Sequence, residues 1–206
     1  MTFERNSEGK MKIWRLLADV NRYACFADHP TLSLEEILSI DGRSLAQDWE
    51  TRKLERIDDG DLPLGDVLGF GANFLVNDAV RQLFTDLGIS GIEYLPMEYQ
   101  GITYYLPNVT EKIDCLDRQR SAALYSPTNK DRILFVNRYC FHEDLIGEKI
   151  MFRLKDEPHR MAFVTETVVS ALREAGMKGF CYELVYDGKE DPGRKVSVDG
   201  VISLEY

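Results

Sequence analysis

Two segments of this chain carry the same pattern, and this internal repeat constrains the fold more than any other feature. The segment LVNDAVRQLFTDLGISGIEYLPM (75–97) aligns without gaps with FVTETVVSALREAGMKGFCYELV (163–185), at an offset of 88 residues. The identical pairs are Val76 and Val164, Val80 and Val168, Gly88 and Gly176, Gly91 and Gly179, and Tyr94 and Tyr182. Each copy predicts one amphipathic helix, a turn and one strand.

Both copies contain signals for the beginning and the end of a helix. Asn77 and Thr165 are N-cap residue types, whose side-chain oxygens accept hydrogen bonds from the first turn. Gly88 and Gly176 stand where a left-handed residue ends the helix, and the apolar residue after each glycine fits a Schellman motif. The repeat therefore predicts two similarly packed helix–turn–strand units.

The rest of the chain reads mainly as strands. Residues 91–108 predict a β-hairpin around EYQG whose two strands end at Pro96 and Pro107. The other predicted elements are strands at 11–19, 131–139 and 148–156, a short helix at 31–40, a long irregular connection at 41–71, and a turn at GFGANF (69–74). We expect an α+β fold, a mainly antiparallel sheet with few helices, formed by one domain (11–206) after a disordered tail (1–10).

Composition narrows the classes of function. The chain carries 25 basic and 35 acidic residues, and this net charge of −10 disfavours nucleic acid and suits a basic protein partner. No apolar run approaches the roughly 20 residues that cross a bilayer. The N-terminus, MTFERNSEGK, lacks the apolar core of a secretory signal, so we expect no membrane association and a cytoplasmic location.

The four cysteines and three histidines predict neither disulfides nor a metal centre. The cysteines lie far apart and form no C-x-x-C pair, so four reduced thiols are expected in a reducing compartment. No histidine pair has the spacing of a helical zinc site, and no glycine-rich cofactor motif occurs. We therefore predict neither a metal nor a cofactor.

Cys115 is the candidate nucleophile, because it stands among charged residues in the segment NVTEKIDCLDRQRSAALY (108–125). A phosphatase loop needs the spacing C-x5-R, whereas the arginines here are Arg118 and Arg120, and Ser121 occupies the required position. His142 is a second candidate, but nothing in the sequence places it beside the thiol. The spacing favours a structural thiol over a catalytic one.

Acidic and aromatic residues supply a candidate docking surface. Acidic residues cluster within the predicted irregular connection, and tyrosines crowd the predicted hairpin, where alternation must turn some of them inward. The residues that we predict to contact a partner are Asp58, Asp59, Asp61, Asp66, Tyr99 and Tyr104. The competing interpretation is that the acidic loops are merely solvated.

Several segments together resemble the bacterial polymorphic-toxin immunity family eleven, first catalogued as a domain of unknown function. They are MKIWRL, GIEYLPMEYQGITYYLPNVTEKIDCLDRQRS, KIMFRL and FVTETVVSALREAGMKGFCYEL, and the resemblance runs from about Met11 to Tyr186. The most specific parts are the E-x-L-P strand from Glu93, the segment from Leu106 to Asp117, and the closing helix–GMKGF unit. One departure is the glycine-rich stretch LPLGDVLGFGANF, which is longer than expected.

The resemblance implies an immunity protein, not an enzyme, that binds and neutralises a cognate toxin domain in the cytosol. The toxins expected in the cytosol are nucleases and nucleotide- or protein-modifying enzymes. A basic nuclease would suit such an acidic protein, which would cover the substrate cleft of the toxin. Two other functions stay open: a small enzyme with a site near Cys115 and His142, and a homo-oligomeric scaffold.

Overall fold

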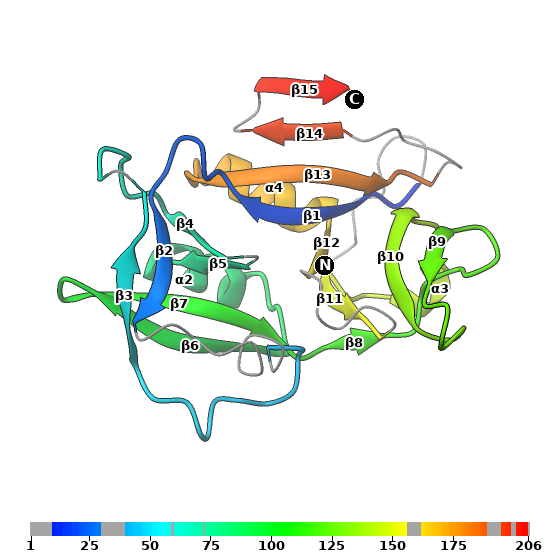
Figure 1. Ribbon diagram of the computed structural model, residues 1–206. Helices are drawn as coiled ribbons and strands as arrows, with labels where there is room; N and C mark the ends of the chain where they lie inside the picture. Colours follow the sequence, from blue (N-terminus) through cyan, green and yellow to red (C-terminus); the bar gives the residue numbers. More distant parts are fainter. Residues whose placement is uncertain are drawn as a thin grey trace.

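A closed barrel and a long sheet share one layer of side chains in the computed structural model of this chain (Figure 1). The structure describes residues 10–29, 40–58, 60–71, 73–155, 162–188, 195–198 and 201–205. The predicted disordered tail, apart from Lys10, and the predicted helix at 31–40, apart from Ile40, lie outside the described residues. Mostly antiparallel strands and few helices confirm the predicted α+β class.

The long sheet has seven strands in the order β15-β14-β13-β1-β12-β11-β8. Their bounds are β1 Ile13–Ala18, β8 Lys112–Ile113, β11 Met151–Leu154, β12 Phe163–Thr165, β13 Phe180–Tyr186, β14 Lys195–Val198 and β15 Val201–Glu205. β1 pairs antiparallel with both β12 and β13, so the first strand of the chain lies between the two strands of the second repeat. Alternation along these buried strands gives the sheet two apolar faces.

The barrel has six strands in the closed order β2-β3-β6-β7-β5-β4. Their bounds are β2 Cys25–His29, β3 Arg52–Arg56, β4 Val67–Phe70, β5 Asn73–Val76, β6 Ile92–Tyr99 and β7 Ile102–Val109. Side chains from alternate positions fill its interior: Ala24, Phe26, Ile40, Leu54, Leu68, Phe70, Leu75, Leu95, Met97, Tyr104 and Leu106. The intervening positions of β4 to β7 face outward and join the core beneath the long sheet.

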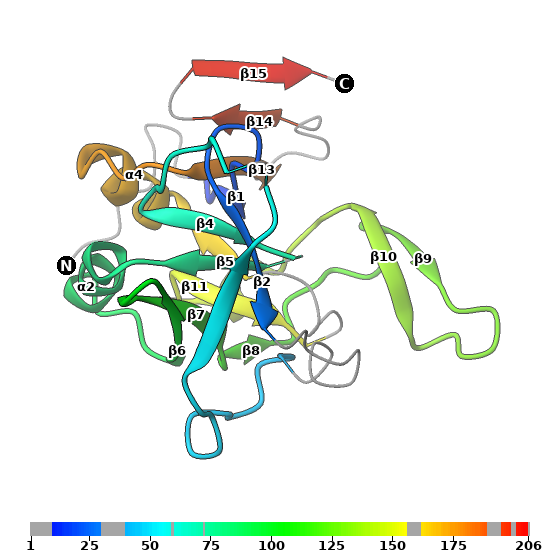
Figure 2. The ribbon, with the colours of Figure 1, turned by 60° about the vertical axis from the view of Figure 1, so that its left-hand side comes forward.

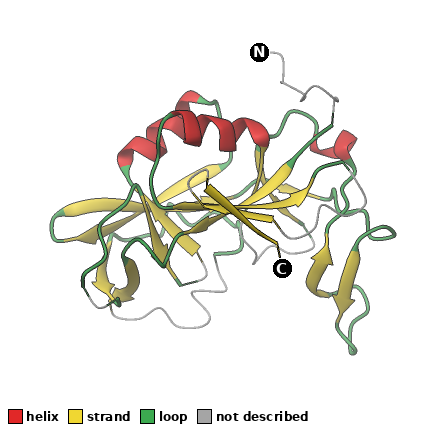
Figure 3. Cartoon of the chain, turned by 90° about the horizontal axis from the view of Figure 1, so that it is seen from above, coloured by secondary structure: helices red, strands yellow, loops and turns green. Residues whose placement is uncertain are grey.

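The two repeat copies meet over that shared core. Helices α2 (Asp78–Asp86) and α4 (Glu166–Glu174) contact one another and lie on the same side of the strands (Figure 3). Val80 and Phe84 of the first copy and Val168 and Leu172 of the second are buried in one cluster. The strands of the first copy belong to the barrel and those of the second to the long sheet, so the repeat joins the two halves of the molecule.

The helix ends follow the sequence signals with one exception. Val80 N–H donates to Asn77 Oδ1 at 3.0 Å, which confirms the first N-cap. Gly88 has a φ of 70°, and Ile89 N–H donates to the Phe84 carbonyl at 3.1 Å; the second copy repeats this Schellman geometry. Thr165 holds the predicted N-cap position of α4, but its buried Oγ1 makes no hydrogen bond, so the expected side-chain cap is not formed.

The hairpin at 91–108 is confirmed as β6 and β7, but its prolines are not strand ends. Gln100 and Gly101 both have positive φ, 51° and 81°, as a two-residue type I′ turn requires. Pro96 and Pro107 stand inside the strands, opposite Tyr105 and Tyr94. The Pro96 carbonyl accepts a bond from Trp49, so the backbone of Pro96 points away from β7 and its missing N–H costs the hairpin no bond.

The predicted irregular connection at 41–71 instead contains two barrel strands. β3 has the sequence RKLER and buries only Leu54, so its strand character comes from pairing with β2 and β6. The predicted turn at GFGANF is found at Gly71, which has a φ of 55°, whereas Gly69 belongs to β4 and pairs with Phe74 of β5. A Cβ on Gly69 would lie 2.8 Å from Cys25 Sγ, which explains a glycine inside this strand.

A two-stranded sheet and a short helix cover the other face of the long sheet. β9 (Ala122–Tyr125) pairs with β10 (Ile133–Arg138), and α3 spans Glu143–Ile146. Figures 1 and 2 show that β9 and β10 project from one end of the molecule. Sequence reasoning predicted β10 but neither β9 nor α3. Among the described helices, none has the length and apolar character needed to span a membrane.

Candidate functional site

Asp58, a predicted docking residue, is held inside its own loop. Its carboxylate accepts hydrogen bonds from Cys25 N–H at 2.8 Å, Gly60 N–H at 2.9 Å and Arg56 Nε at 2.8 Å. Its side chain is 10% exposed, and the hydrogen bond from Arg56 lowers the pKa of Asp58 to about 2. The bonds from Cys25 and Gly60 make Asp58 close its loop. Because the carboxylate also forms an ion pair with Arg56, it offers little net charge to a partner.

Asp61 and Tyr99 lie near the same loop and remain open to solvent to different degrees. Asp61 is exposed. Tyr99 is half-buried and packs edge-on against Phe26, with ring centroids 4.7 Å apart. Arg56 donates to the Leu62 carbonyl and is also hydrogen-bonded to Tyr99, so it ties the loop to the hairpin. Asp59 lies outside the described residues.

Asp66 points away from that loop and joins three segments. It accepts hydrogen bonds from Asn77 Nδ2 at 2.8 Å and from Lys178 N–H at 2.7 Å. Its carbonyl accepts Asn77 N–H at 2.9 Å. The same side chain therefore fixes the beginning of α2 and the turn between α4 and β13.

Tyr104 lies inside the barrel with 4% of its surface exposed. Burial, followed by the charge of Asp66, raises its pKa. The six predicted docking residues therefore do not form one surface: Asp58, Asp61 and Tyr99 lie together, Asp66 is engaged elsewhere, and Tyr104 belongs to the core.

Cys115 and His142 come close through their backbones but not as a catalytic pair. His142 N–H donates to the Cys115 carbonyl at 2.9 Å, beside the bridge between Leu116 and Phe141. The side chain of Cys115 is 0% exposed within an apolar cluster, whereas His142 is exposed. A nucleophilic thiol needs access to its substrate, and this arrangement gives Cys115 none.

The segment that follows Cys115 anchors the projecting sheet. Asp117 Oδ1 accepts the N–H groups of Gln119 and Arg120, both at 3.0 Å, and so caps the turn that leads into β9. Ser121 Oγ accepts from Cys140 N–H at 2.9 Å. Asp117 thus has a structural role, because it and Ser121 fold the two ends of the projection onto the body.

A polar cluster closes one end of the barrel. Asn108 is fully buried and its Nδ2 donates to the Arg43 carbonyl at 2.7 Å and to Glu93 Oε2 at 3.0 Å. Glu93 also accepts from Ser44 Oγ and from Leu45 N–H. Burial raises the pKa of Glu93, but these hydrogen bonds outweigh it and hold the pKa below its ordinary value. The E-x-L-P and N-V-T segments therefore fasten the loop at 43–45 to the hairpin.

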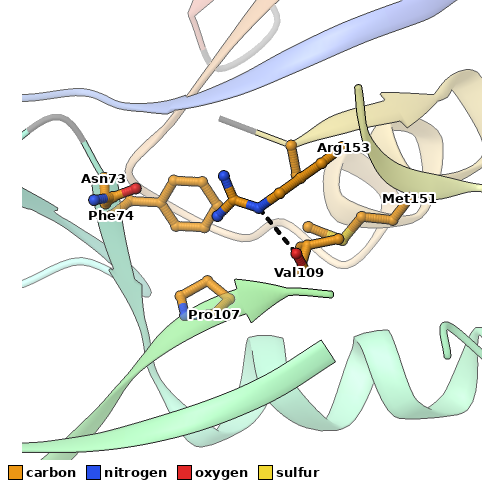
Figure 4. A pocket seen from close by; sticks show the side chains of 7 residues that line it. Asn73, Phe74, Pro107, Val109, Met151 and Arg153 are labelled. Carbon is orange, nitrogen blue, oxygen red and sulfur yellow. Dashed lines mark hydrogen bonds between the residues drawn. The ribbon is translucent and has the colours of Figure 1, made fainter. Parts of the chain in front are cut away.

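A small hollow of about 10 Å³, roughly the size of a single water molecule, opens where the barrel meets the long sheet (Figure 4). Its lining residues are Asn73, Phe74, Pro107, Val109, Met151, Arg153 and Ala162. Arg153 is 3% exposed and its Nε donates to the Val109 carbonyl at 2.9 Å. Burial lowers the pKa of Arg153 to about 10, although Asp41 opposes the shift, so the side chain stays cationic at neutral pH.

The guanidinium of Arg153 reaches from β11 toward Phe74 of the barrel (Figure 4). It therefore fills the junction and joins β11 to β7, which is a structural role. In the part of the chain that the structure describes, no three His, Cys, Asp or Glu side chains gather closely enough to hold a metal ion.

The projecting sheet carries a surface that sequence reasoning missed. Leu124 and Phe135 stand directly opposite one another and are 50% and 37% exposed. The signal was present in the sequence, because residues 118–138 contain five basic side chains and one acidic side chain in a chain of net charge −10. Averaging charge over the whole chain concealed this local reversal.

Comparison with known proteins gives one match. No curated protein resembles the chain closely enough to register. Residues 24–187 match the family described as an immunity protein family (Imm11), which confirms the resemblance first seen in the E-x-L-P, N-V-T and GMKGF segments. That range includes the whole barrel, the projecting sheet and both repeat copies. The chain therefore belongs to the immunity protein family Imm11.

Proposed function

We propose that this protein is a stoichiometric inhibitor that binds a cognate secreted toxin domain in the bacterial cytosol and covers its active site. The observation that carries the proposal is the family match over residues 24–187. Immunity by binding requires a stable scaffold that presents a surface and needs no reactive group. The buried thiol of Cys115 and the structural role of the neighbouring Asp117 are compatible with that requirement.

The toxin reaches the cytosol by contact-dependent or type VI-like secretion and is a basic enzyme such as a nuclease. The net charge of −10 supports this part of the proposal, because complementary fields speed association and suppress wrong pairings. Covering a substrate cleft buries roughly 1,200–2,000 Å² in total. A surface of that size extends well beyond any single loop.

Within the acidic loop, Asp61 is the residue that we propose to steer the toxin. Asp58 is neutralised by Arg56, and Asp66 is occupied by Asn77 and Lys178. Reversal of one exposed charge should slow association severalfold at low salt and much less at high salt. An association rate that does not respond to Asp61→Lys at any salt concentration would remove this residue from the interface.

The test of the function is co-expression with the C-terminal domain encoded by the neighbouring upstream gene. Growth and co-elution are scored together. Restored growth with a complex of fixed stoichiometry is the expected result. Restored growth without any complex would require catalytic protection and would overturn the binding mechanism. Failure to restore growth would overturn the proposed function itself for that gene pair.

A further inference from the structure

The projecting sheet differs in charge from the rest of the molecule. We call residues 118–138 the arm; it comprises the turn before β9, both strands and their connection. The arm holds Arg118, Arg120, Lys130, Arg132 and Arg138 against Asp131 alone, and all five basic residues are exposed. The remainder of the chain holds 20 basic and 34 acidic residues. A basic arm thus stands on an acidic body.

One face of the arm is fixed to the body. Ile133 and Val136 of β10 are each 8% exposed. Both belong to the apolar cluster on the other face of the long sheet, away from the core that the sheet shares with the barrel. Their partners in register, Tyr125 and Ala123 of β9, pack against the same cluster. Hydrogen bonds between Ser121 and Cys140 close the base of the arm. Because this face is anchored, the opposite face is presented in a defined geometry before any partner arrives.

The opposite face combines exposed apolar side chains with a cation. Leu124 and Phe135 form a cross-strand pair. The inward-facing pair of Ala123 with Val136 follows along the strands, and then the pair of Ala122 with Arg138. Leu134, in the bulge beside Phe135, adds a third exposed apolar side chain, with 42% of its surface exposed. Among the described residues, eight large apolar side chains are at least 37% exposed, and three of these eight lie on the arm. Aromatic residues and arginines are enriched at protein interfaces, and the two leucines add apolar area that a partner can bury.

We propose that the arm docks on the cognate toxin, in an apolar depression bordered by Asp or Glu carboxylates. Charge complementarity selects this chemistry, because the five cations of the arm would repel a basic surface and leave their charges unmatched on a neutral one. The inference rests on the proposed function and adds to it the chemistry of the contact. The toxin is then basic where the acidic body steers it and acidic where the arm is seated.

The first experiment measures the affinity of the purified protein for the C-terminal domain encoded by the upstream gene. The arm variant is Leu124→Ser with Phe135→Ser, and the matched control is Ile102→Ser. Ile102 is 47% exposed at the tip of the hairpin, at the opposite end of the molecule from the arm (Figure 1). We expect the arm variant to bind at least about tenfold more weakly and the control to bind within about twofold of wild type.

A charge-reversal pair tests the acidic border of the depression. The arm substitution is Lys130→Glu, and its control is Lys53→Glu on β3 of the barrel. Both lysines are exposed. Lys130→Glu should weaken binding about fivefold at low salt, and added salt should shrink that difference. Lys53→Glu should not weaken binding. Far-ultraviolet circular dichroism and melting temperature confirm that each variant is folded.

The outcomes separate this inference from the proposed function. Failure of the wild-type protein to bind or protect overturns both. If the wild-type protein and the arm variant bind the toxin equally tightly, the inference about the arm is overturned and the proposed function stands. Sedimentation across a range of concentrations tests whether the arm instead binds a second copy of this chain. If the arm variant abolishes self-association and leaves the affinity for the toxin unchanged, the arm is a self-association surface and the inference is overturned.

Discussion

Single residues that look similar in the sequence have different roles once their partners are known. Asp58, Asp61 and Asp66 all belong to one acidic stretch. The first caps a loop, the second is exposed, and the third joins segments 112 residues apart in the chain. A carboxylate that accepts several hydrogen bonds is part of the folded structure, so its removal is expected to affect stability before binding.

Asp58→Asn should change how stability depends on acid. The pKa of Asp58 in the folded chain is about 2, below its ordinary value of 3.8, so its stabilising effect is present above pH 4 and is lost as pH falls through about 2. Urea unfolding between pH 6 and pH 2 should show the wild-type protein more stable than the variant at the upper end and equal to it at the lower end. A stability gap that persists unchanged at pH 2 would contradict this.

Cys115 should label slowly in the native protein. Its side chain is 0% exposed, whereas Cys181 is partly exposed, so alkylation at Cys115 requires the cluster around it to open. Peptide mass spectrometry after timed treatment with iodoacetamide gives the rate at each position. Rapid native labelling of Cys115, ahead of Cys181, would instead indicate an accessible thiol and restore the enzyme hypothesis.

At the scale of elements, the repeat has the same helix ends but different helix beginnings. Both helices end in a Schellman motif with a glycine at positive φ. Asn77 caps α2 through its side chain, whereas Thr165 leaves its hydroxyl buried without a partner at the beginning of α4. The backbone N–H of Thr165 donates to the Ile150 carbonyl at 2.9 Å, because this residue also ends β12.

The two caps therefore predict opposite responses to substitution. Asn77→Ala should lower the free energy of unfolding by about 1 kcal/mol, since the amide of Val80 loses its acceptor. Thr165→Val should leave it unchanged or raise it by up to about 1 kcal/mol, because a buried hydroxyl without a partner is replaced by a methyl group. Chemical denaturation of both variants measures the difference. Equal losses in the two variants would mean that Thr165 caps its helix after all.

At the scale of the whole molecule, a few polar contacts and one shared core hold the barrel against the long sheet. Arg153 and Asp66 reach between segments of the two halves, while α2 and α4 bury their apolar faces together. The arm lies outside this junction and is anchored through a separate cluster. Contacts at the junction should therefore affect folding, and changes on the outer face of the arm should affect binding.

Asp66→Ala tests that separation, with Asp61→Ala as its matched control. Loss of the bonds to Asn77 and Lys178 should lower the free energy of unfolding by about 2 kcal/mol. Asp61 is exposed, and its truncation should change stability by less than about 0.5 kcal/mol. Thermal or urea unfolding of the two variants, with toxin affinity measured in parallel, gives the result. Equal stability of both variants would show that Asp66 does not join the two halves.

The sequence by itself determined the features that depend on neighbours in the chain. The repeat predicted both helices and the strands after them, because N-cap residues and helix-ending glycines act within a few positions. The pattern at 91–108 predicted its hairpin for the same reason, through alternation and a turn that favours positive φ. The order of several short segments also indicates the family to which the chain belongs.

Tertiary structure decided the features that depend on distant partners. RKLER reads as a solvated stretch until β2 and β6 pair with it, and Tyr104 reads as a surface tyrosine until the barrel closes around it. The sequence around Asp58 and Asp66 does not indicate which backbone amides donate to their carboxylates, since Cys25 and Lys178 lie far away along the chain. The basic character of the arm was written in the sequence. Its fixed inner face and exposed outer face follow only from the packing of β9 and β10 on the body, because burial is a property of the folded arrangement.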